Sequence, residues 1–255
     1  MNRSLLLASC ALVACGGTPH DTRRADEQGA SEGTVRVEQH PWLQLRVEAS
    51  PPLIARLGID AAEVEYRLSA AVGIGRLHQM PHAVELVVAT CDQPRAFWDS
   101  STRRITLCWE LIAAMSRAGS EPARAPGIAH FVALHEIGHA LIDGLGLPVI
   151  GREEDAADAF GALFLIVGDN QSFVRAVVDA ARFFRDTDRD LTSFWDEHSF
   201  GEARYYSLLC LVAGGSPTVG PEVAALIPAS RAERCRAEYV QTKTSWDTMV
   251  ANATR

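Results

Sequence analysis

Two histidines and a glutamate stand close together in the segment His135-Glu136-Ile137-Gly138-His139. Positions four residues apart lie on one face of a helix, so His135 and His139 can direct ring nitrogens at a single ion. A catalytic zinc takes three such protein ligands and keeps its fourth position for water. Glu136 lies about 100° around the helix from His135, where it can take a proton from the metal-activated water. The spacing therefore predicts a zinc-dependent hydrolase with Glu136 as general base.

The third zinc ligand is expected from residues 153–158, whose sequence EEDAAD offers four carboxylates. Glu154 and Asp158 are four residues apart and share a helix face. One can therefore bind the ion while the other accepts the outer N–H of a ligand histidine. Glu153 and Asp155 lie to either side, and first-turn acids stabilise a helix N-terminus whatever the function. We therefore expect Glu154 as the metal ligand and Asp158 as the residue that orients a histidine.

The helix that carries the two histidines is expected to be buried, because apolar residues occupy nearly all of its faces. These residues are Phe131, Val132, Leu134, Ile137, Ala140, Leu141 and Ile142. Gly138 lets another backbone pass close to it. Two histidines and a glutamate in such a helix are costly unless a metal compensates them. The alternative, core histidines bonded to backbone carbonyls, explains the pattern less well. His130 has no partner spacing and is expected to be structural or exposed.

The elements that position these residues run from strands to helices. Strands are expected at 84–89 and 104–108, joined through a turn at 99–102 into an antiparallel ribbon. A loop is expected over 119–127. Helices are expected at 60–72, 110–118, 128–143, 153–167, from 172 onward, at 202–212 and at 231–241. The fold class is therefore α+β, a small antiparallel sheet followed by a mostly helical C-terminal part.

The N-terminus resembles an export signal, with Arg3 before a short apolar stretch at 4–14. Residues 12–15, Leu-Val-Ala-Cys, resemble a bacterial lipobox, which implies a signal peptide over 1–14 and lipid attachment to Cys15. A plain signal peptide with a chance cysteine is the alternative. The polar stretch 15–39 is expected to be a flexible tether. Residues 40–255 then form one domain, held at the bacterial envelope.

Four cysteines remain after such processing, namely Cys91, Cys108, Cys210 and Cys235. An even number in an oxidising compartment predicts two disulfides with three possible pairings, and sequence proximity favours Cys91–Cys108 and Cys210–Cys235. Closely spaced cysteine pairs, which a cysteine-bound zinc would need, do not occur. The formal net charge of −8 gives no electrostatic reason to expect nucleic acid as a partner.

The segment 135–139 with Glu154 and Asp158 resembles the gluzincin pattern, in which HExxH is completed by a glutamate in an ExxxD segment on the next helix. Residues 135–143, 147–158 and 195–198, together with the four cysteines, resemble the bacterial metallopeptidase family DUF4344. The resemblance implies a zincin-like fold, one zinc ion and a peptide or protein substrate.

Gluzincins place a histidine or tyrosine from a later helix near the oxyanion of the reaction intermediate. His198 is the best candidate by its order in the chain, with Arg204 and Tyr205 as weaker ones; an ordinary surface role for His198 weighs equally. The strand at 104–108 precedes the metal helix, as the substrate-binding edge strand does in zincins. The aromatic pair 97–98 beside it either lines the cleft or, more commonly, belongs to the core.

The leading hypothesis is a monomeric, lipid-anchored zinc metallopeptidase with His135, His139 and Glu154 as ligands. A catalytically inactive zinc-binding lipoprotein with an assembly role is the second hypothesis, and the intact Glu136 argues against it. Zinc-dependent hydrolysis of a non-peptide amide is the third, and it uses every one of the same residues.

Overall fold

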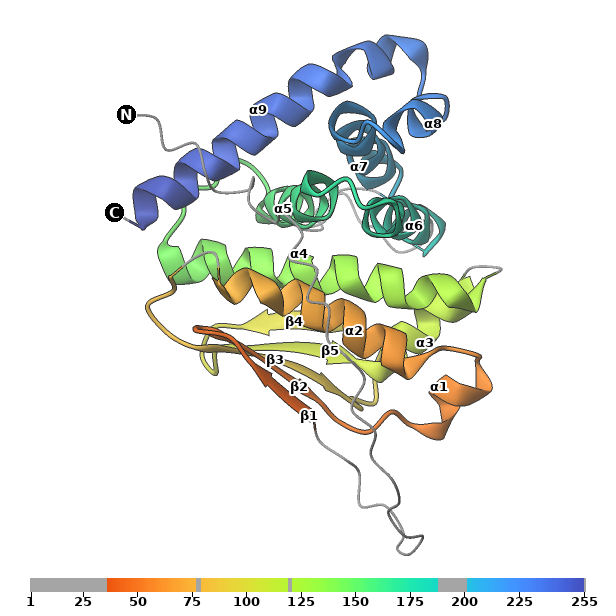
Figure 1. Cartoon of the computed structure of the whole chain (residues 1–255), viewed down its shortest axis with the longest axis vertical. Coiled ribbons are helices and arrows are strands. Elements are labelled where there is room, and N and C mark those ends of the chain that lie inside the picture. The colour runs from red at the N-terminus through yellow and green to blue at the C-terminus, as the bar shows by residue number, and fades with distance from the viewer. Residues whose placement is uncertain (1–35, 77–78, 119–120, 188–200, 255) are drawn as a thin grey trace, which may run out of the picture.

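The computed structural model describes residues 36–76, 79–118, 121–187 and 201–254. Strands come first and helices follow (Figure 1). The strands are β1 (Arg36–Gln39), β2 (Leu43–Val47), β3 (Val84–Ala89), β4 (Ala96–Asp99) and β5 (Arg104–Cys108). The helices are α1 (Pro52–Arg56), α2 (Ala61–Val72), α3 (Trp109–Ala118), α4 (Ala125–Leu145), α5 (Glu153–Val167), α6 (Gln171–Thr187), α7 (Gly201–Gly215), α8 (Gly220–Ala224) and α9 (Ala229–Ala253). The predicted α+β class is confirmed.

The sheet is mixed, in the order β1-β2-β3-β5-β4. The pairs β2–β3 and β3–β5 are parallel, whereas β1 and β4 pair antiparallel at the two edges. The predicted antiparallel ribbon of 84–89 with 104–108 is therefore wrong. The turn at 99–102 is real, because the Asp99 carboxylate accepts the backbone N–H groups of Ser101 and Thr102. It joins β4 to β5, and β5 then inserts beside β3.

Both predicted disulfides are present, Cys91–Cys108 and Cys210–Cys235. The first links the chain just after β3 to the end of β5, where Ala89 and Cys108 are paired in register. The second links α7 to α9. Structural disulfides of this kind are typical of proteins that fold in an oxidising, non-cytoplasmic compartment.

The helices form layers on one face of the sheet (Figure 1). Helices α2 and α4 lie next to the strands, α5 and α6 lie across α4 on its far side, and α9 crosses the outer side of the molecule. Asp60 caps the N-terminus of α2, since its carboxylate accepts the backbone N–H groups of Ala62 and Glu63. Among the described residues, no helix has the length and apolar character needed to cross a bilayer.

Helix α4 is longer than expected, because the predicted loop over 119–127 ends before it. Pro126 and Gly127 belong to its first turn, where proline is tolerated since no helical N–H is needed there. The helix ends at Gly146, whose φ of 59° is the left-handed conformation that favours glycine. The predicted domain boundary at residue 40 also falls late, since 36–39 already form β1 in the sheet.

His130 lies on α4 with no exposed surface, so of the two alternatives for this residue the buried one holds. Its ring packs edge-on against Phe173 of α6, at 4.9 Å between centroids. Among the described residues, no hydrogen-bond partner reaches either of its ring nitrogens. Burial, reinforced by the charge of Arg67, lowers the pKa of His130 from 6.5 to about 3.

We expect this histidine to destabilise the fold as the pH falls. Between pH 6.5 and 3, His130 is protonated in the unfolded chain but stays neutral in the folded protein. The free energy of unfolding therefore decreases as the pH is lowered through this window. At pH 4 the penalty is roughly 3 kcal/mol. The free energy of urea unfolding, measured from pH 7 to 4, should fall less steeply in His130→Leu than in the wild type. Parallel curves would contradict the burial of a neutral imidazole.

Candidate metal centre

The packing of α4 on α5 brings three predicted ligands together. His135 Nε2 lies 3.1 Å from Glu154 Oε2 and 3.1 Å from His139 Nε2. His139 Nε2 lies 3.3 Å from Glu154 Oε1. Tetrahedral zinc with bonds of about 2.0–2.2 Å separates its ligand atoms by roughly 3.3–3.5 Å. Two imidazole nitrogens and a carboxylate at nearly this spacing fit such an ion, and they match the ligand set of a catalytic zinc site.

Close approach of the two helices makes this convergence possible. A Cβ atom built on Gly138 would lie 3.1 Å from the Cα of Ala157, closer than side chains normally pack. Gly138 therefore lets the backbone of α5 pass beside the histidine turn, as its position in the motif predicted. A larger residue there would push α5, and Glu154 with it, away from the histidines.

The Nδ1 atom of each histidine, on the side of the ring away from the other ligands, lies within hydrogen-bonding distance of a carboxylate on α5. His135 Nδ1 lies 2.9 Å from Asp158 Oδ1, and His139 Nδ1 lies 2.8 Å from Glu153 Oε1. An Nδ1–H that donates to a carboxylate leaves the Nε2 lone pair for a metal. Asp158 thus does what its spacing predicted. Glu153 has a role that the sequence did not reveal, because an acid in the first turn of a helix is common without one.

A buried arginine lies behind Asp158. Arg204 Nε donates to Asp158 Oδ2 and Arg204 Nη2 to Asp158 Oδ1, both at 2.8 Å. Burial alone would raise the pKa of Asp158, but the charge of Arg204 and the bond from His135 lower it to about 2. Burial alone would lower the pKa of His135, but its hydrogen bonds with Asp158 and Glu154 raise it to about 10. The weaker expectation that Arg204 stabilises an oxyanion is therefore not supported, because its guanidinium is bound to Asp158 and Arg204 does not line the cleft in front of the three ligands.

Glu136 lies beside the three ligands and not among them. It is buried, and the backbone N–H of Trp98 on β4 is the weakest of the influences that lower the pKa of its carboxyl group. Burial raises the pKa of Glu136 above its ordinary value, against the opposing charges of the two histidines. A carboxylate whose pKa is raised toward neutrality is a better proton acceptor and donor in turn than an exposed one.

A cleft of about 490 Å³ opens in front of these groups. It is lined by Ala96, Phe97, Trp98, His135, Glu136, His139, Arg152, Glu153 and Glu154. The aromatic pair 97–98 therefore lines the cleft, which was the less common of its two expected roles. The sheet edge beside the site is β4 and not the predicted 104–108, because β5 is paired on both sides. The Trp98 indole N–H, 3.3 Å from Asp143 Oδ2, ties this edge to α4.

Comparison with known protein families matches residues 65–250 to the model of DUF4344, described as "Putative metallopeptidase". The chain belongs to this family. The matched region includes α4, α5 and α7, and hence every residue of the centre described above. Comparison with curated proteins and with solved structures gives no match.

Two predicted residues of this DUF4344 chain lie outside the described residues, namely His198 and the lipidation candidate Cys15. Tyr205 is buried, with the Arg185 guanidinium 4.6 Å from its ring centroid, and is not one of the residues that line the cleft.

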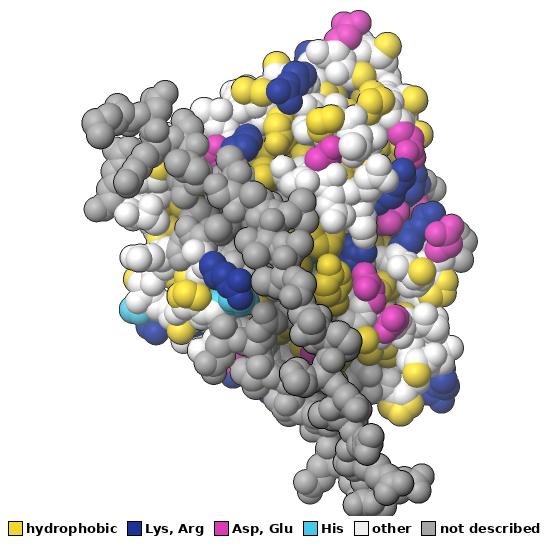
Figure 2. Space-filling model, in the orientation of Figure 1, with side chains coloured by type: hydrophobic (Ala, Val, Ile, Leu, Met, Phe, Trp, Pro, Cys, Tyr) yellow, Lys and Arg dark blue, Asp and Glu magenta, His cyan; other side chains and the backbone are white. Residues whose placement is uncertain are grey.

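On the face shown in Figure 2, Lys and Arg side chains alternate with Asp and Glu and do not gather into one basic patch.

Proposed function

We propose that this DUF4344 chain is a zinc-dependent peptidase in which His135, His139 and Glu154 hold the ion and Glu136 is the general base. One observation carries the proposal. The metal-directed atoms of the three ligands converge on one point, while Glu136 faces the same cleft without joining them. A site that bound zinc for structure alone would have no use for a buried carboxylate in that place.

When bound, a zinc ion supplies a Lewis acid that polarises a carbonyl and lowers the pKa of water. The chain supplies the proton transfers. Glu136 accepts a proton from the attacking water and later delivers it to the leaving amine, which its raised pKa favours. Asp158 and Glu153 fix the two imidazoles through their Nδ1 atoms.

Among the described residues β4 is an edge strand of the sheet, and this edge offers a binding surface for an extended peptide. Hydrogen-bonded pairs alternate along an antiparallel ladder, and Cys108 N–H donates to Arg95 O at its start. The backbone groups of Ala96 and Trp98 must therefore point away from β5. One of them, the Trp98 N–H, reaches Glu136. A peptide that pairs with this edge would place its backbone beside the general base.

The remaining parts of the proposal concern residues outside the described ranges. His198 is proposed to stabilise the oxyanion, and Cys15 to carry a lipid that anchors a monomeric enzyme to the bacterial envelope. The two disulfides support export, because they require an oxidising compartment.

A cleavage assay with a peptide library tests the proposal. We expect hydrolysis by the purified protein, its loss after a chelator removes zinc, and its recovery when about one equivalent of zinc is returned. A Glu136→Gln variant is purified in parallel as a control, because any peptide cleavage in that preparation comes from a contaminating protease. Hydrolysis that persists after complete zinc removal would contradict the proposal. So would a zinc-loaded protein that cleaves simple amides but no peptide, which would favour the amidohydrolase alternative.

A further inference from the structure

We infer that Arg204 is a positioning residue of the metal centre, which acts through Asp158 to hold His135 in its metal-binding orientation. The inference rests on the proposed zinc site but not on hydrolysis. Arg204 comes from α7, Asp158 from α5 and His135 from α4. One line of hydrogen bonds thus runs from Arg204 on α7 through Asp158 on α5 to Nδ1 of His135 on α4, the ring nitrogen on the far side from the metal-directed Nε2.

The geometry of the pair explains why an arginine is needed. Both carboxylate oxygens of Asp158 accept from the guanidinium, Oδ2 from Nε and Oδ1 from Nη2. Oδ1 is also the atom that lies 2.9 Å from His135 Nδ1. A two-point contact stops the carboxylate from rotating, so Oδ1 stays in line with the imidazole. A lysine, with a single ammonium nitrogen, cannot form this fork.

Arg204 is itself fixed in place. Its guanidinium carbon lies 3.6 Å from the centroid of the Phe184 ring on α6. Phe184 in turn packs against Phe131 on α4, one turn before His135, with ring centroids 5.9 Å apart. Asp158 and Arg204 are only 6% and 8% exposed. The orientation of His135 therefore depends on a pair of which little is exposed, although both residues also line a pocket of about 970 Å³ between α5, α7 and α9.

The second histidine is held differently. His139 is bonded to Glu153, whose side chain is 50% exposed. Water can replace an exposed partner at little cost, whereas a buried one has no substitute. Substitution of the partners of His135 should therefore lower the zinc affinity more than substitution of the partner of His139.

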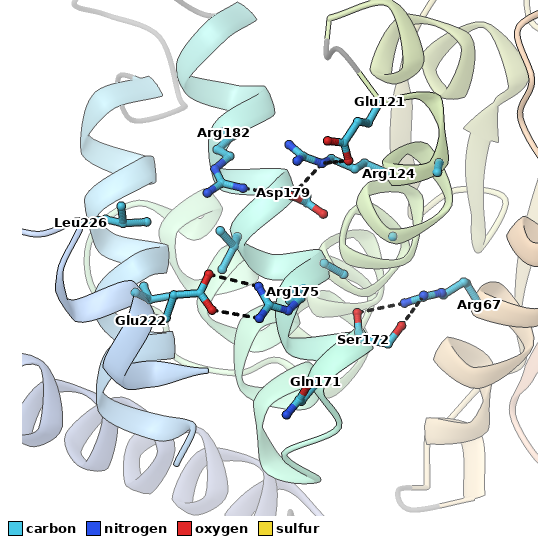
Figure 3. Close-up of a pocket in the computed structure, with 15 residues that line it drawn as sticks. Arg67, Glu121, Arg124, Gln171, Ser172, Arg175, Asp179, Arg182, Glu222 and Leu226 are labelled. Carbon is cyan, nitrogen blue, oxygen red and sulfur yellow. Dashed lines mark hydrogen bonds and ion pairs between the residues drawn. The ribbon is translucent and has the colours of Figure 1, made fainter. Parts of the chain in front are cut away.

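Zinc affinity, measured by competition with a chelating dye, tests the inference without any substrate. Removal of an outer partner of a ligand histidine costs about 10–100-fold in metal affinity. We expect Arg204→Met to weaken zinc binding by this factor. The affinity of Arg204→Lys should lie between that of Arg204→Met and that of the wild type. The matched control is Arg175→Met, because Arg175 also makes a two-point contact with a carboxylate, donating from Nη1 and Nη2 to Glu222 on the surface at 3.2 and 2.9 Å (Figure 3). It should leave the affinity unchanged within about twofold.

A double-substitution cycle separates positioning from a merely structural effect. If Arg204 acts through Asp158, Arg204→Met should weaken zinc binding by no more than about twofold in a chain that already carries Asp158→Asn. This comparison also serves if Arg204→Met alone does not fold, since the double variant leaves no buried charge unpaired. A full 10–100-fold loss in the Asp158→Asn background would overturn the inference, as would wild-type affinity in folded Arg204→Met. A chain that binds zinc but cleaves nothing would contradict the proposed function alone.

Discussion

Glu136→Gln should abolish hydrolysis while the protein still binds one zinc. Glutamine has nearly the shape of glutamate, so the cleft and the three ligands should persist, but its amide cannot accept the proton of the attacking water. General-base catalysis contributes about 10²–10⁴-fold, and the same group also serves the leaving amine. We therefore expect kcat/KM to fall by about 10³-fold or more, with zinc content by mass spectrometry unchanged.

The control for this variant is Glu110→Gln. The Glu110 carboxylate also binds backbone N–H groups, those of Cys91 and Asp92, but it does not line the cleft. It should keep wild-type activity. A Glu136→Gln protein that cleaved peptides at a rate near the wild type would remove Glu136 from the mechanism, and one that lost its zinc would make Glu136 part of the ligand set.

The second large effect is expected at Glu154. Glu154→Ala removes one of three ligands, and its loss should exceed the 10–100-fold range of an outer partner, so zinc affinity should fall by at least about 100-fold. The neighbouring Glu153→Ala is the matched variant, because it removes only the half-exposed partner of His139 Nδ1. We expect about a tenfold loss there. The dye competition assay measures both. A greater loss of zinc affinity in Glu153→Ala than in Glu154→Ala would show that Glu153 is the metal ligand and that Glu154 is not.

Local patterns in the sequence predicted most of the longer helices. Helix α5 begins and ends at the expected residues, 153 and 167, but α9 runs from 229 to 253, well beyond the expected 231–241, and the short helices α1 and α8 were not predicted. The strand pairing of the sheet was harder to predict. Strand pairing is non-local, and β4 has only four residues, so the pattern of 84–89 and 104–108 could not reveal a third strand between them. The wrong prediction that 84–89 and 104–108 pair antiparallel followed from that omission, because the turn at 99–102 joins β4 to β5 and β3 pairs parallel with β5.

The metal centre was predictable where spacing decides it. His135, His139, Glu154 and Asp158 all follow from the helical repeat, because residues four apart share a face. Arg204 could be named but not given its role, since it meets Asp158 across 46 residues of sequence. No spacing rule connects positions on separate helices. The contact of β4 with Glu136 was hidden for the same reason.

The zinc content of the purified wild-type protein tests the central claim most directly. Native mass spectrometry of the folded chain should show one zinc ion per molecule, which chelation removes and which His135→Ala does not retain. A folded protein that holds no stoichiometric zinc, or one that keeps it after His135→Ala, would contradict the account.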